Sequence, residues 1–387
     1  MEMESNKIFD ILIVGSGLSG AVIARESAEK GKKVLILERR DHTGGNMHDH
    51  VNDAGILVHD YGPHTFHTND QKLINYMCRF AKWQEYRLTC GAKINGQFTP
   101  TPFNFATIDT FFSKDKADEI KLALGREYPG KSMVSILKLL DSSITCIREY
   151  ARFLYDNDYS LYTAKQWGIS PTEIDPSVLE RVPVRLNYDT GYFEDAYQVM
   201  PEISYNDFFH SLLDHPNIMV KLRVDANDDI SFKKNKMFFG GEVLQKPVVY
   251  TGAIDELFTY KHGRLPYRSL HFEWVIEEKE SFQEAPVVAY PQAEEYTRIT
   301  EYTKLPLQKV GNRTAYAVEF PVDYQKRDSA EPYYPVITAA SQEIYMRYRE
   351  EVLRYPNLYV CGRLGDFRYY NMDQALKRAL CVAGEIF

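Results

Sequence analysis

The sequence predicts an α/β protein in which a Rossmann-like dinucleotide-binding domain carries an inserted helical domain and an antiparallel β-sheet domain. Three observations predict this fold: a strand, glycine loop, helix and second strand in the first forty residues, a helical pattern that begins near residue 105, and strand-like runs between 243 and 320. A chain of 387 residues has room for two or three such units. The formal net charge of −8, without a long run of one sign, argues against a general nucleic-acid binder.

The amino-terminal segment has the order of elements that a dinucleotide site requires. Phe9 to Val14 is an apolar run typical of a buried parallel strand, and Gly15-Ser16-Gly17-Leu18-Ser19-Gly20 follows it. Helical spacing extends from Leu18 to Lys30, and Lys33 to Leu37 forms a second strand that leads into Glu38. In this context the glycines allow a tight turn and a close approach of a pyrophosphate, while Glu38 is placed to bind ribose hydroxyls.

A second glycine motif narrows the choice of dinucleotide. After Glu38 the chain reads Arg39-Arg40-Asp41-His42-Thr43-Gly44-Gly45-Asn46, which resembles the second glycine signature of flavoproteins of the glutathione-reductase and amine-oxidase type. An acidic ribose partner also argues against a 2′-phosphate, and therefore against NADP. We therefore expect FAD, bound non-covalently.

The remaining elements divide the chain into five stretches. We predict the first part of the FAD-binding domain in 1–85, a helical domain in 105–180 followed by a mobile loop to about 191, return segments in 192–242, an antiparallel substrate domain in 243–320, and the last part of the FAD-binding domain in 321–387. Residues 72–80 look helical, and Cys90 to Phe98 reads as a strand that turns at Asn95-Gly96, after which Pro100 and Pro102 break the chain. The last strand is Tyr359 to Gly362, and the last helix is Asp373 to Ile386.

The cysteines and the hydropathy of the chain indicate its cellular compartment. The five cysteines form no C-x-x-C pair, so we expect neither a disulfide framework nor a metal site. The start of the chain lacks the basic and apolar regions of a signal peptide, and no apolar stretch approaches ~20 residues. These features favour a cytoplasmic protein without a membrane span.

Several unusual peptides occur along nearly the whole chain. They are Tyr61-Gly62-Pro63-His64-Thr65-Phe66-His67-Thr68, Tyr162-Thr163-Ala164-Lys165-Gln166-Trp167-Gly168, Arg181-Val182-Pro183-Val184-Arg185 with Asn187-Tyr188-Asp189, Tyr250-Thr251-Gly252, Tyr267-Arg268-Ser269-Leu270, Thr300-Glu301-Tyr302 and Cys361-Gly362-Arg363-Leu364-Gly365. Together they are far more specific than the glycine loop alone. With these peptides the sequence resembles the UDP-galactopyranose mutase family.

The resemblance implies an isomerase that interconverts UDP-galactopyranose and UDP-galactofuranose. In this family reduced FAD is required, and its N5 atom displaces UDP from the sugar to form a covalent flavin–sugar adduct. The implied partners are the UDP-sugar and a reductant for the flavin, with a homodimer as an open possibility. The furanose product would serve the biosynthesis of a cell-surface polysaccharide.

The resemblance also assigns roles to particular residues. Arg181 and Arg268 match the two arginines that contact the diphosphate, and His64 matches a residue beside the flavin ring. The further expected substrate-binding residues are Tyr162, which would stack on uracil, Tyr302 and Tyr369, which would donate to the diphosphate, and Thr163, Trp167, Tyr192 and Asn371. The expected FAD-binding residues are Gly15, Gly17, Leu18, Gly20, Glu38, Arg39, Gly45, Asn46, His64, Thr65, Arg363, Met372 and Asp373.

Two departures from the family pattern fall around the substrate. Asn371 stands where the family commonly has an aspartate, and Asp158-Tyr159 stands where it has an aromatic pair. Both departures leave the identity of the substrate's sugar undetermined, so that UDP-N-acetylgalactosamine or another UDP-hexose is an alternative to UDP-galactose. A flavin oxidase of the amine-oxidase type is the rival from another mechanistic class. We also predict that the proline-rich, polar segment from Gly168 to Gly191 is a lid that brings Arg181 to the diphosphate.

Overall fold

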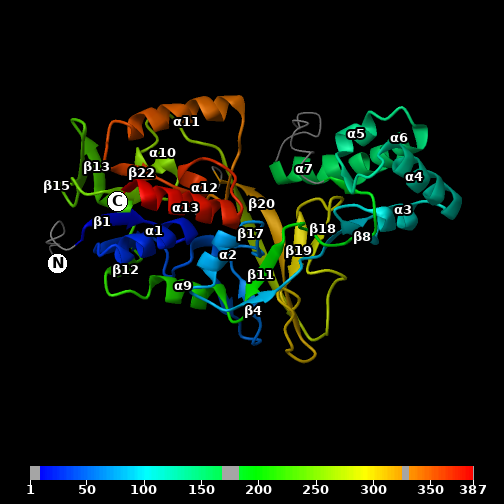
Figure 1. The fold of residues 1–387 in the computed structure, drawn as a ribbon, viewed down its shortest axis with the longest axis horizontal. Helices are drawn as coiled ribbons and strands as arrows, with labels where there is room; N and C mark the ends of the chain where they lie inside the picture. Colours follow the sequence, from blue (N-terminus) through cyan, green and yellow to red (C-terminus); the bar gives the residue numbers. More distant parts are fainter. Residues whose placement is uncertain (1–8, 168–182, 325–330, 387) are drawn as a thin grey trace.

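The computed structural model describes residues 9–167, 183–324 and 331–386. Figure 1 shows an elongated molecule with a parallel sheet and its helices at one end, a helical domain at the other, and a long, mostly antiparallel sheet between them. The first and the last described residues both lie at the parallel-sheet end. The α/β fold class predicted from the sequence is confirmed.

The parallel sheet has five strands in the order β12-β2-β1-β16-β22. Their bounds are β1 (Ile11–Val14), β2 (Val34–Glu38), β12 (Ile218–Leu222), β16 (Val248–Tyr250) and β22 (Leu358–Val360). The predicted start of the antiparallel sheet at residue 243 is therefore wrong, because β16 pairs in parallel with β1 at the centre of this sheet. A short, fully buried apolar strand looks the same in either kind of sheet, so its partners cannot be read from its composition.

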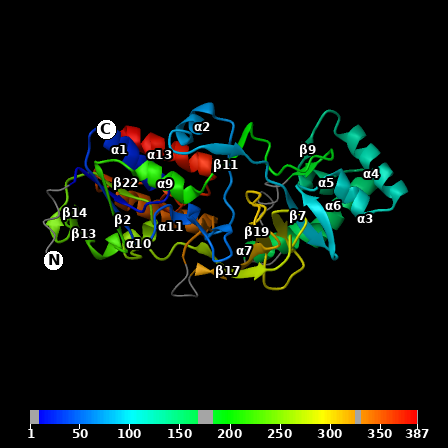
Figure 2. The ribbon, with the colours of Figure 1, turned by 90° about the horizontal axis from the view of Figure 1, so that it is seen from below.

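Helices cover both faces of the parallel sheet, as Figure 2 shows. Ile11, Ile13 and Val249 point to the face covered by α1 (Leu18–Glu29), α9 (Tyr205–Leu213) and α13 (Met372–Ile386). Leu12, Leu35 and Val248 point to the face covered by α10 (Ile254–Leu257), α11 (Ala339–Val352) and a small sheet of β13 (Ile230–Lys233), β14 (Lys236–Phe239) and β15 (Glu242–Val243). This alternation is the period-two pattern of strands that are buried on both faces.

The long sheet has seven strands in the order β21-β17-β20-β19-β18-β7-β8. The bounds are β7 (Cys90–Ile94), β8 (Gln97–Thr101), β17 (Tyr267–Glu277), β18 (Val287–Ala289), β19 (Arg298–Glu301), β20 (Thr314–Asp323) and β21 (Tyr334–Pro335). The predicted turn at Asn95-Gly96 is confirmed, since both residues have positive φ and join β7 to β8. Pro100 does not break the chain as predicted, because β8 is an edge strand, where a residue without an N–H is tolerated.

The helical domain follows β8 directly. It comprises α3 (Phe105–Phe111), α4 (Lys114–Glu127), α5 (Ile136–Leu140), α6 (Thr145–Leu154), a π-helix (Tyr155–Tyr159) and α7 (Ser160–Trp167). Asn104 and Ser135 cap α3 and α5 through their side chains, which satisfies backbone N–H groups at the helix starts. A two-stranded ribbon of β9 (Met133–Val134) and β10 (Val184–Arg185) closes the domain.

Short elements join the two sheets. They are β3 (Asp49–Val51) with β4 (Leu57–His59), a three-stranded sheet of β5 (Phe66–Thr68), β11 (Tyr197–Pro201) and β6 (Trp83–Glu85), the helix α2 (Gln71–Met77), and α12 (Gly362–Gly365) before α13. The predicted helices at 72–80 and 373–386 correspond to α2 and α13. The loop predicted over Gly168–Gly191 is only partly described, because residues 168–182 lie outside the described residues and β10 begins at Val184.

Candidate active site

The two glycine motifs meet above the carboxyl end of β1. A Cβ atom on Gly20 would lie 2.0 Å from the Gly15 carbonyl oxygen, and one on Gly45 would lie 2.9 Å from Cα of Gly17. Gly45 also has a φ of +57°, which disfavours any side chain there. The two segments can therefore pack closely only because glycines occupy both, and the amino end of α1 is left accessible to an anion.

Glu38 ends β2 beside this glycine loop. Its Oε2 atom accepts hydrogen bonds from the backbone N–H and the hydroxyl of Ser16, both at 2.8 Å, and its Oε1 atom accepts one from the Arg40 N–H at 3.0 Å. These bonds hold the buried carboxylate at the sheet edge, where the sequence predicts a ribose contact. That contact stays a prediction.

A pocket extends from this loop across the carboxyl ends of the strands. Ten of the expected FAD-binding residues line it: Gly15, Gly17, Leu18, Glu38, Arg39, Gly45, Asn46, His64, Arg363 and Met372. Gly20, Thr65 and Asp373 are not part of its lining; Gly20 packs α1 against β1, and Asp373 accepts a hydrogen bond from Thr68. The structure adds residues 224–227, Tyr250, Thr251, Gly252 and Tyr333. Its glycine cradle, acid and extended shape fit a dinucleotide such as FAD.

At one end of this pocket, His64 lies near a second, fully buried histidine. The His64 N–H donates to Nδ1 of His59 at 3.1 Å, and Nδ1 of His64 lies 2.8 Å from the Gly62 carbonyl oxygen. Burial, followed by the Arg363 charge, lowers the pKa of His64 to about 4. Burial and His64 lower the pKa of His59 to about 3. Both rings are therefore neutral at pH 7, and the bond to Gly62 assigns the His64 proton to Nδ1, which leaves Nε2 as an acceptor.

A group of polar side chains surrounds Arg298, the first residue of β19, and we call Tyr162, Tyr192, Arg298, Glu319 and Tyr334 the Arg298 cluster. Arg298 donates from Nε at 2.8 Å and from Nη2 at 2.7 Å to the same carboxylate oxygen of Glu319. Burial opposes the charge, but Glu319 and the hydroxyls of Tyr162 and Tyr334 raise the pKa of Arg298. Sequence reasoning missed Arg298 and Tyr334; the only signal was that Arg298 lies just before the matched peptide Thr300-Glu301-Tyr302.

Arg268, on β17, is a predicted substrate contact whose donors are unsatisfied. Its Nε and Nη2 atoms are buried and have no hydrogen-bond partner among the described residues. Burial lowers the pKa of its guanidinium, and Asp323 opposes this effect. Buried donors without acceptors are costly, so this arginine is suited to receive an anionic ligand.

The other predicted substrate residues fall into three groups. Tyr369 stacks on Tyr334 with ring centroids 5.8 Å apart, and Arg363 lies over both rings. Tyr302 is fully buried and its hydroxyl donates to the His59 carbonyl oxygen at 3.0 Å, so its donation to the diphosphate stays a prediction. Thr163 is buried on α7, Asn371 is partly buried before α13, and Trp167 ends α7, whereas Arg181 lies outside the described residues.

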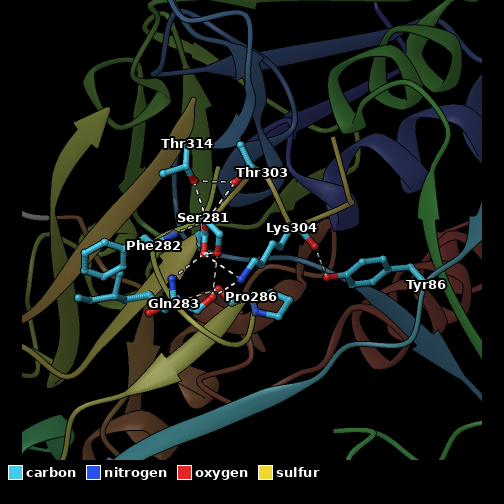
Figure 3. Close-up of polar contacts among 10 residues, drawn as sticks. Tyr86, Ser281, Phe282, Gln283, Pro286, Thr303, Lys304 and Thr314 are labelled. Atoms are coloured by element: carbon cyan, nitrogen blue, oxygen red, sulfur yellow. Dashed lines mark hydrogen bonds and ion pairs between the residues drawn. The ribbon is translucent and has the colours of Figure 1, made fainter. Parts of the chain in front are cut away.

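Glu301 ends β19 and fixes that strand in place. Figure 3 shows its partners Phe282, Gln283, Lys304 and Thr314 lying around one point. Its fully buried carboxylate accepts from the Phe282 N–H at 2.8 Å, the Gln283 N–H at 3.1 Å and the Thr314 hydroxyl at 2.7 Å. Burial disfavours the charge, but these donors and Lys304, at 3.2 Å, hold the pKa of Glu301 below its ordinary value. This set of contacts, the Glu301 cluster, anchors the strand that carries Arg298.

Comparisons with known proteins agree with this geometry. A family model described as UDP-galactopyranose mutase matches residues 157–369, and one described as an NAD(P)-binding Rossmann-like domain matches residues 13–80. The chain is 34% identical over 384 residues to the UDP-galactopyranose mutase of Mycoplasma pneumoniae, covering 98% of this chain and 96% of that one. It is also 34% identical over 379 residues to the dTDP-fucopyranose mutase of Escherichia coli, covering 96% of each chain.

A crystal structure of reduced UDP-galactopyranose mutase has the same fold, with a TM-score of 0.74, 16% identity and coverage of 98% of this chain and 93% of that one. Within the described residues, no helix has the length and apolar character needed to cross a membrane. The same residues contain no group of three or more His, Cys, Asp or Glu side chains that could hold a metal ion.

Proposed function

The chain belongs to the UDP-galactopyranose mutase family, and from this premise we propose that it interconverts UDP-galactopyranose and UDP-galactofuranose with FAD as its cofactor. One structural observation supports the proposal beyond family membership. His64 and Arg363 line the dinucleotide pocket and also interact with the Arg298 cluster, so a flavin and a nucleotide sugar would meet at these two residues.

The arginines would bind the diphosphate. Arg268 is the stronger candidate for charge neutralisation, since its buried donors lack partners within the described part of the chain. Arg298 shares its charge with Glu319 and would contribute directed N–H groups rather than net charge. Stabilising UDP as a leaving group near the anomeric carbon is the task that these side chains would perform.

The glycine loop, Glu38 and Asn46 would hold the FAD, with His64, Arg363 and Met372 at the ring end of the pocket. Reduced FAD, when bound, would supply the N5 nucleophile for covalent catalysis at the anomeric carbon. His64 would offer Nε2 as a neutral acceptor, because its other nitrogen is engaged by Gly62. Tyr162 would stack on the base, and Tyr369 with Tyr334 would donate to the diphosphate.

UDP-galactose is the proposed substrate, and two observations keep related nucleotide sugars as alternatives. Asn371 and Asp158-Tyr159 depart from the family pattern, which leaves UDP-N-acetylgalactosamine or another UDP-hexose open. In addition, a mutase that is named for dTDP-fucopyranose is as similar in sequence as one named for UDP-galactopyranose. The ring interconversion is therefore common to all of these candidate substrates, which differ only in the nucleotide sugar.

An anaerobic assay tests the proposed activity. Dithionite-reduced, FAD-loaded protein is incubated with UDP-galactofuranose, and UDP-galactopyranose is measured by chromatography alongside the oxidation state of the flavin. The proposal expects conversion without net consumption of reductant, and much slower conversion by the oxidised protein. In the arm that starts from oxidised protein, stoichiometric reduction of the flavin with oxidation of the sugar would instead identify a flavin oxidase or dehydrogenase.

The lid proposed over Gly168–Gly191 needs one correction. Arg185 is buried, lies in β10 and pairs with Asp189 and Glu194 at 3.3 Å each, so this end of the segment is fixed and trypsin should not cleave there. Limited trypsin digestion tests the lid, with Arg181, which lies outside the described residues, as the proposed cleavage point. Protection of that site by saturating UDP would support the lid, and equal cleavage with and without UDP would contradict it.

A further inference from the structure

A π-helix interrupts the helical domain next to the Arg298 cluster. It spans Tyr155–Tyr159, between α6 and α7, and such insertions frequently occur at functional sites. Asp158 lies in this segment, four residues before Tyr162 and seven before Lys165. This spacing places the three side chains on one side of the helix.

Lys165 attaches that side of the helix to a neighbouring loop. Its Nζ donates to the carbonyl oxygens of Tyr290 and Tyr296 at 2.9 Å each and also to that of Ala293. These carbonyls belong to the loop between β18 and β19, which ends at Arg298. A second contact, from Gln292 to Asn157 at 3.2 Å, holds the π-helix to the same loop. Asp158 and Tyr162 are thereby held beside the Arg298 cluster.

Asp158 itself is partly buried and has no hydrogen bond or ion pair among the described residues. The nearby Lys165 ammonium is already coordinated by three carbonyl oxygens. Burial raises the pKa of Asp158 to about 7, and Lys165 opposes this rise only in part. The carboxylate also raises the pKa of the Tyr162 hydroxyl, after the larger effect of burial and alongside other neighbours. A carboxylate without a donor among the described residues thus lies close enough to the partly buried Tyr162 to act on its hydroxyl.

The chemistry of the ligand limits what this carboxylate can bind. A diphosphate is excluded by like charge, and its place is at the arginines. A pyrimidine nucleotide offers two kinds of donor, the imide N3–H at the edge of the base and the ribose hydroxyls. A base that stacks on Tyr162 would present its edge, rather than its face, to neighbouring side chains. The edge donor of uracil is N3–H.

We propose that Asp158 is a specificity-determining residue that accepts a hydrogen bond from the N3–H of the substrate's pyrimidine base. The proposal rests on the proposed function, because it needs a nucleotide whose base lies on Tyr162. It selects uracil and thymine, which carry an imide N–H, against cytosine, whose N3 is an acceptor. It leaves the choice between uracil and thymine to other contacts.

Binding of three ligands to three proteins tests the proposal. The ligands are UDP, N3-methyl-UDP and 2′-deoxy-UDP, and the proteins are the FAD-loaded wild type, Asp158→Leu and the isosteric Asp158→Asn. The control variant is Asp156→Asn, which changes the charge of an exposed residue on the same π-helix. Affinities are measured by titration calorimetry at pH 8, where Asp158 is charged.

The wild type and the Asp156→Asn control should bind UDP about 10- to 100-fold more tightly than N3-methyl-UDP, as expected for a hydrogen bond to a charged group. In Asp158→Leu that ratio should fall to about threefold or less, and what remains measures the bulk of the methyl group. Asp158→Asn should give an intermediate ratio, and it keeps the test decisive if the leucine variant does not fold.

Other outcomes overturn the proposal in distinguishable ways. An unchanged ratio in both Asp158 variants would show that the carboxylate does not contact N3–H. A penalty for 2′-deoxy-UDP that disappears in the variants would assign Asp158 to a ribose hydroxyl instead. Failure of folded, flavin-loaded wild type to bind UDP at all would contradict the proposed function, whereas normal UDP binding without coupling to N3 would contradict this inference alone.

Discussion

One carboxylate on the strand that carries Arg298 and another on the π-helix have opposite surroundings. Glu301 is fully buried yet satisfied by two backbone N–H groups, a hydroxyl and Lys304, so its pKa is lowered. Asp158 is only partly buried, accepts no hydrogen bond within the described ranges, and has a pKa raised to about 7. The described part of the chain supplies every donor that Glu301 needs, whereas none of its groups donates to Asp158.

The difference distinguishes residues that hold the fold together from residues that we propose bind a ligand. Around Glu301 the polar groups satisfy one another, which is the usual condition of a structural network. Among the described residues, the Asp158 carboxylate and two donors of Arg268 have no hydrogen-bond partner, and these two side chains carry opposite charge. A nucleotide diphosphate has the complementary groups, a donor on its base and an anion at its phosphates.

Replacing Arg268 should give the largest effect on activity. We expect Arg268→Ala to lower kcat/KM by at least about 10- to 150-fold, the value for losing one charge-assisted hydrogen bond, with FAD still bound. The matched control is Arg264→Ala, which removes an exposed arginine just before the same strand. Near wild-type kinetics in Arg268→Ala would remove this residue from the site.

Replacing Glu301 should affect stability most. Glu301→Gln places an NH₂ group where backbone N–H donors converge, and we expect a loss of about 2–3 kcal/mol in the free energy of unfolding. Urea unfolding measures it, with Glu280→Gln on the adjacent exposed loop as the control. A loss no larger than that of the control would mean that the Glu301 cluster does not anchor β19.

The buried histidines should make stability depend on pH. The pKa of His59 is lowered to about 3, so the unfolded chain takes up a proton below its ordinary value of 6.5 while the native protein does not. Stability therefore falls as pH decreases from 6.5, by about 2 kcal/mol at pH 5 for this residue. In His59→Asn, whose Oδ1 can replace Nδ1 as the acceptor for His64, the decline should be smaller by that amount. The exposed His210→Asn is the control, and an equal decline in both variants would contradict the account.

The effect of Asp158 on stability should be smaller and opposite in sign to that of Glu301. Its raised pKa means that the native protein holds a proton between about pH 4 and 7 that the unfolded chain releases, so the charge destabilises the fold as pH rises. Asp158→Asn should therefore stabilise the protein by about 1 kcal/mol at pH 8 relative to pH 5, less than a fully buried group would give. Thermal unfolding at the two pH values measures the difference, and destabilisation at pH 8 would place Asp158 among the structural residues.

The sequence predicted the dinucleotide half well because its signals are local. Phe9 to Glu38 includes a turn, a helix and two strands whose requirements are met by neighbours in the chain, and the structure has them within a residue or two. The pairing of β16 was missed because its partners are contributed by segments more than a hundred residues away. Pro100 was misread for a similar reason, since only the finished sheet makes β8 an edge.

The substrate side could be predicted only by resemblance, which does not reveal the contacts of each side chain. Tyr302 lies in a matched peptide, and its hydroxyl donates to the His59 carbonyl oxygen, a contact that no sequence spacing reveals. Arg298 has no distinguishing pattern of its own and becomes conspicuous only when Glu319, Tyr162 and Tyr334 surround it. The burial of a side chain and the identity of its hydrogen-bond partners depend on the tertiary structure, so these assignments required the structure.

The most direct test of the account is a crystal structure of the protein with FAD and UDP. The account predicts FAD in the pocket that Glu38, Gly45 and His64 line, the diphosphate within 3.2 Å of donors on Arg268 or Arg298, and the base on Tyr162 with its N3 directed to Asp158. A diphosphate bound away from both arginines, with Asp158 and Arg268 still unpartnered, would contradict it.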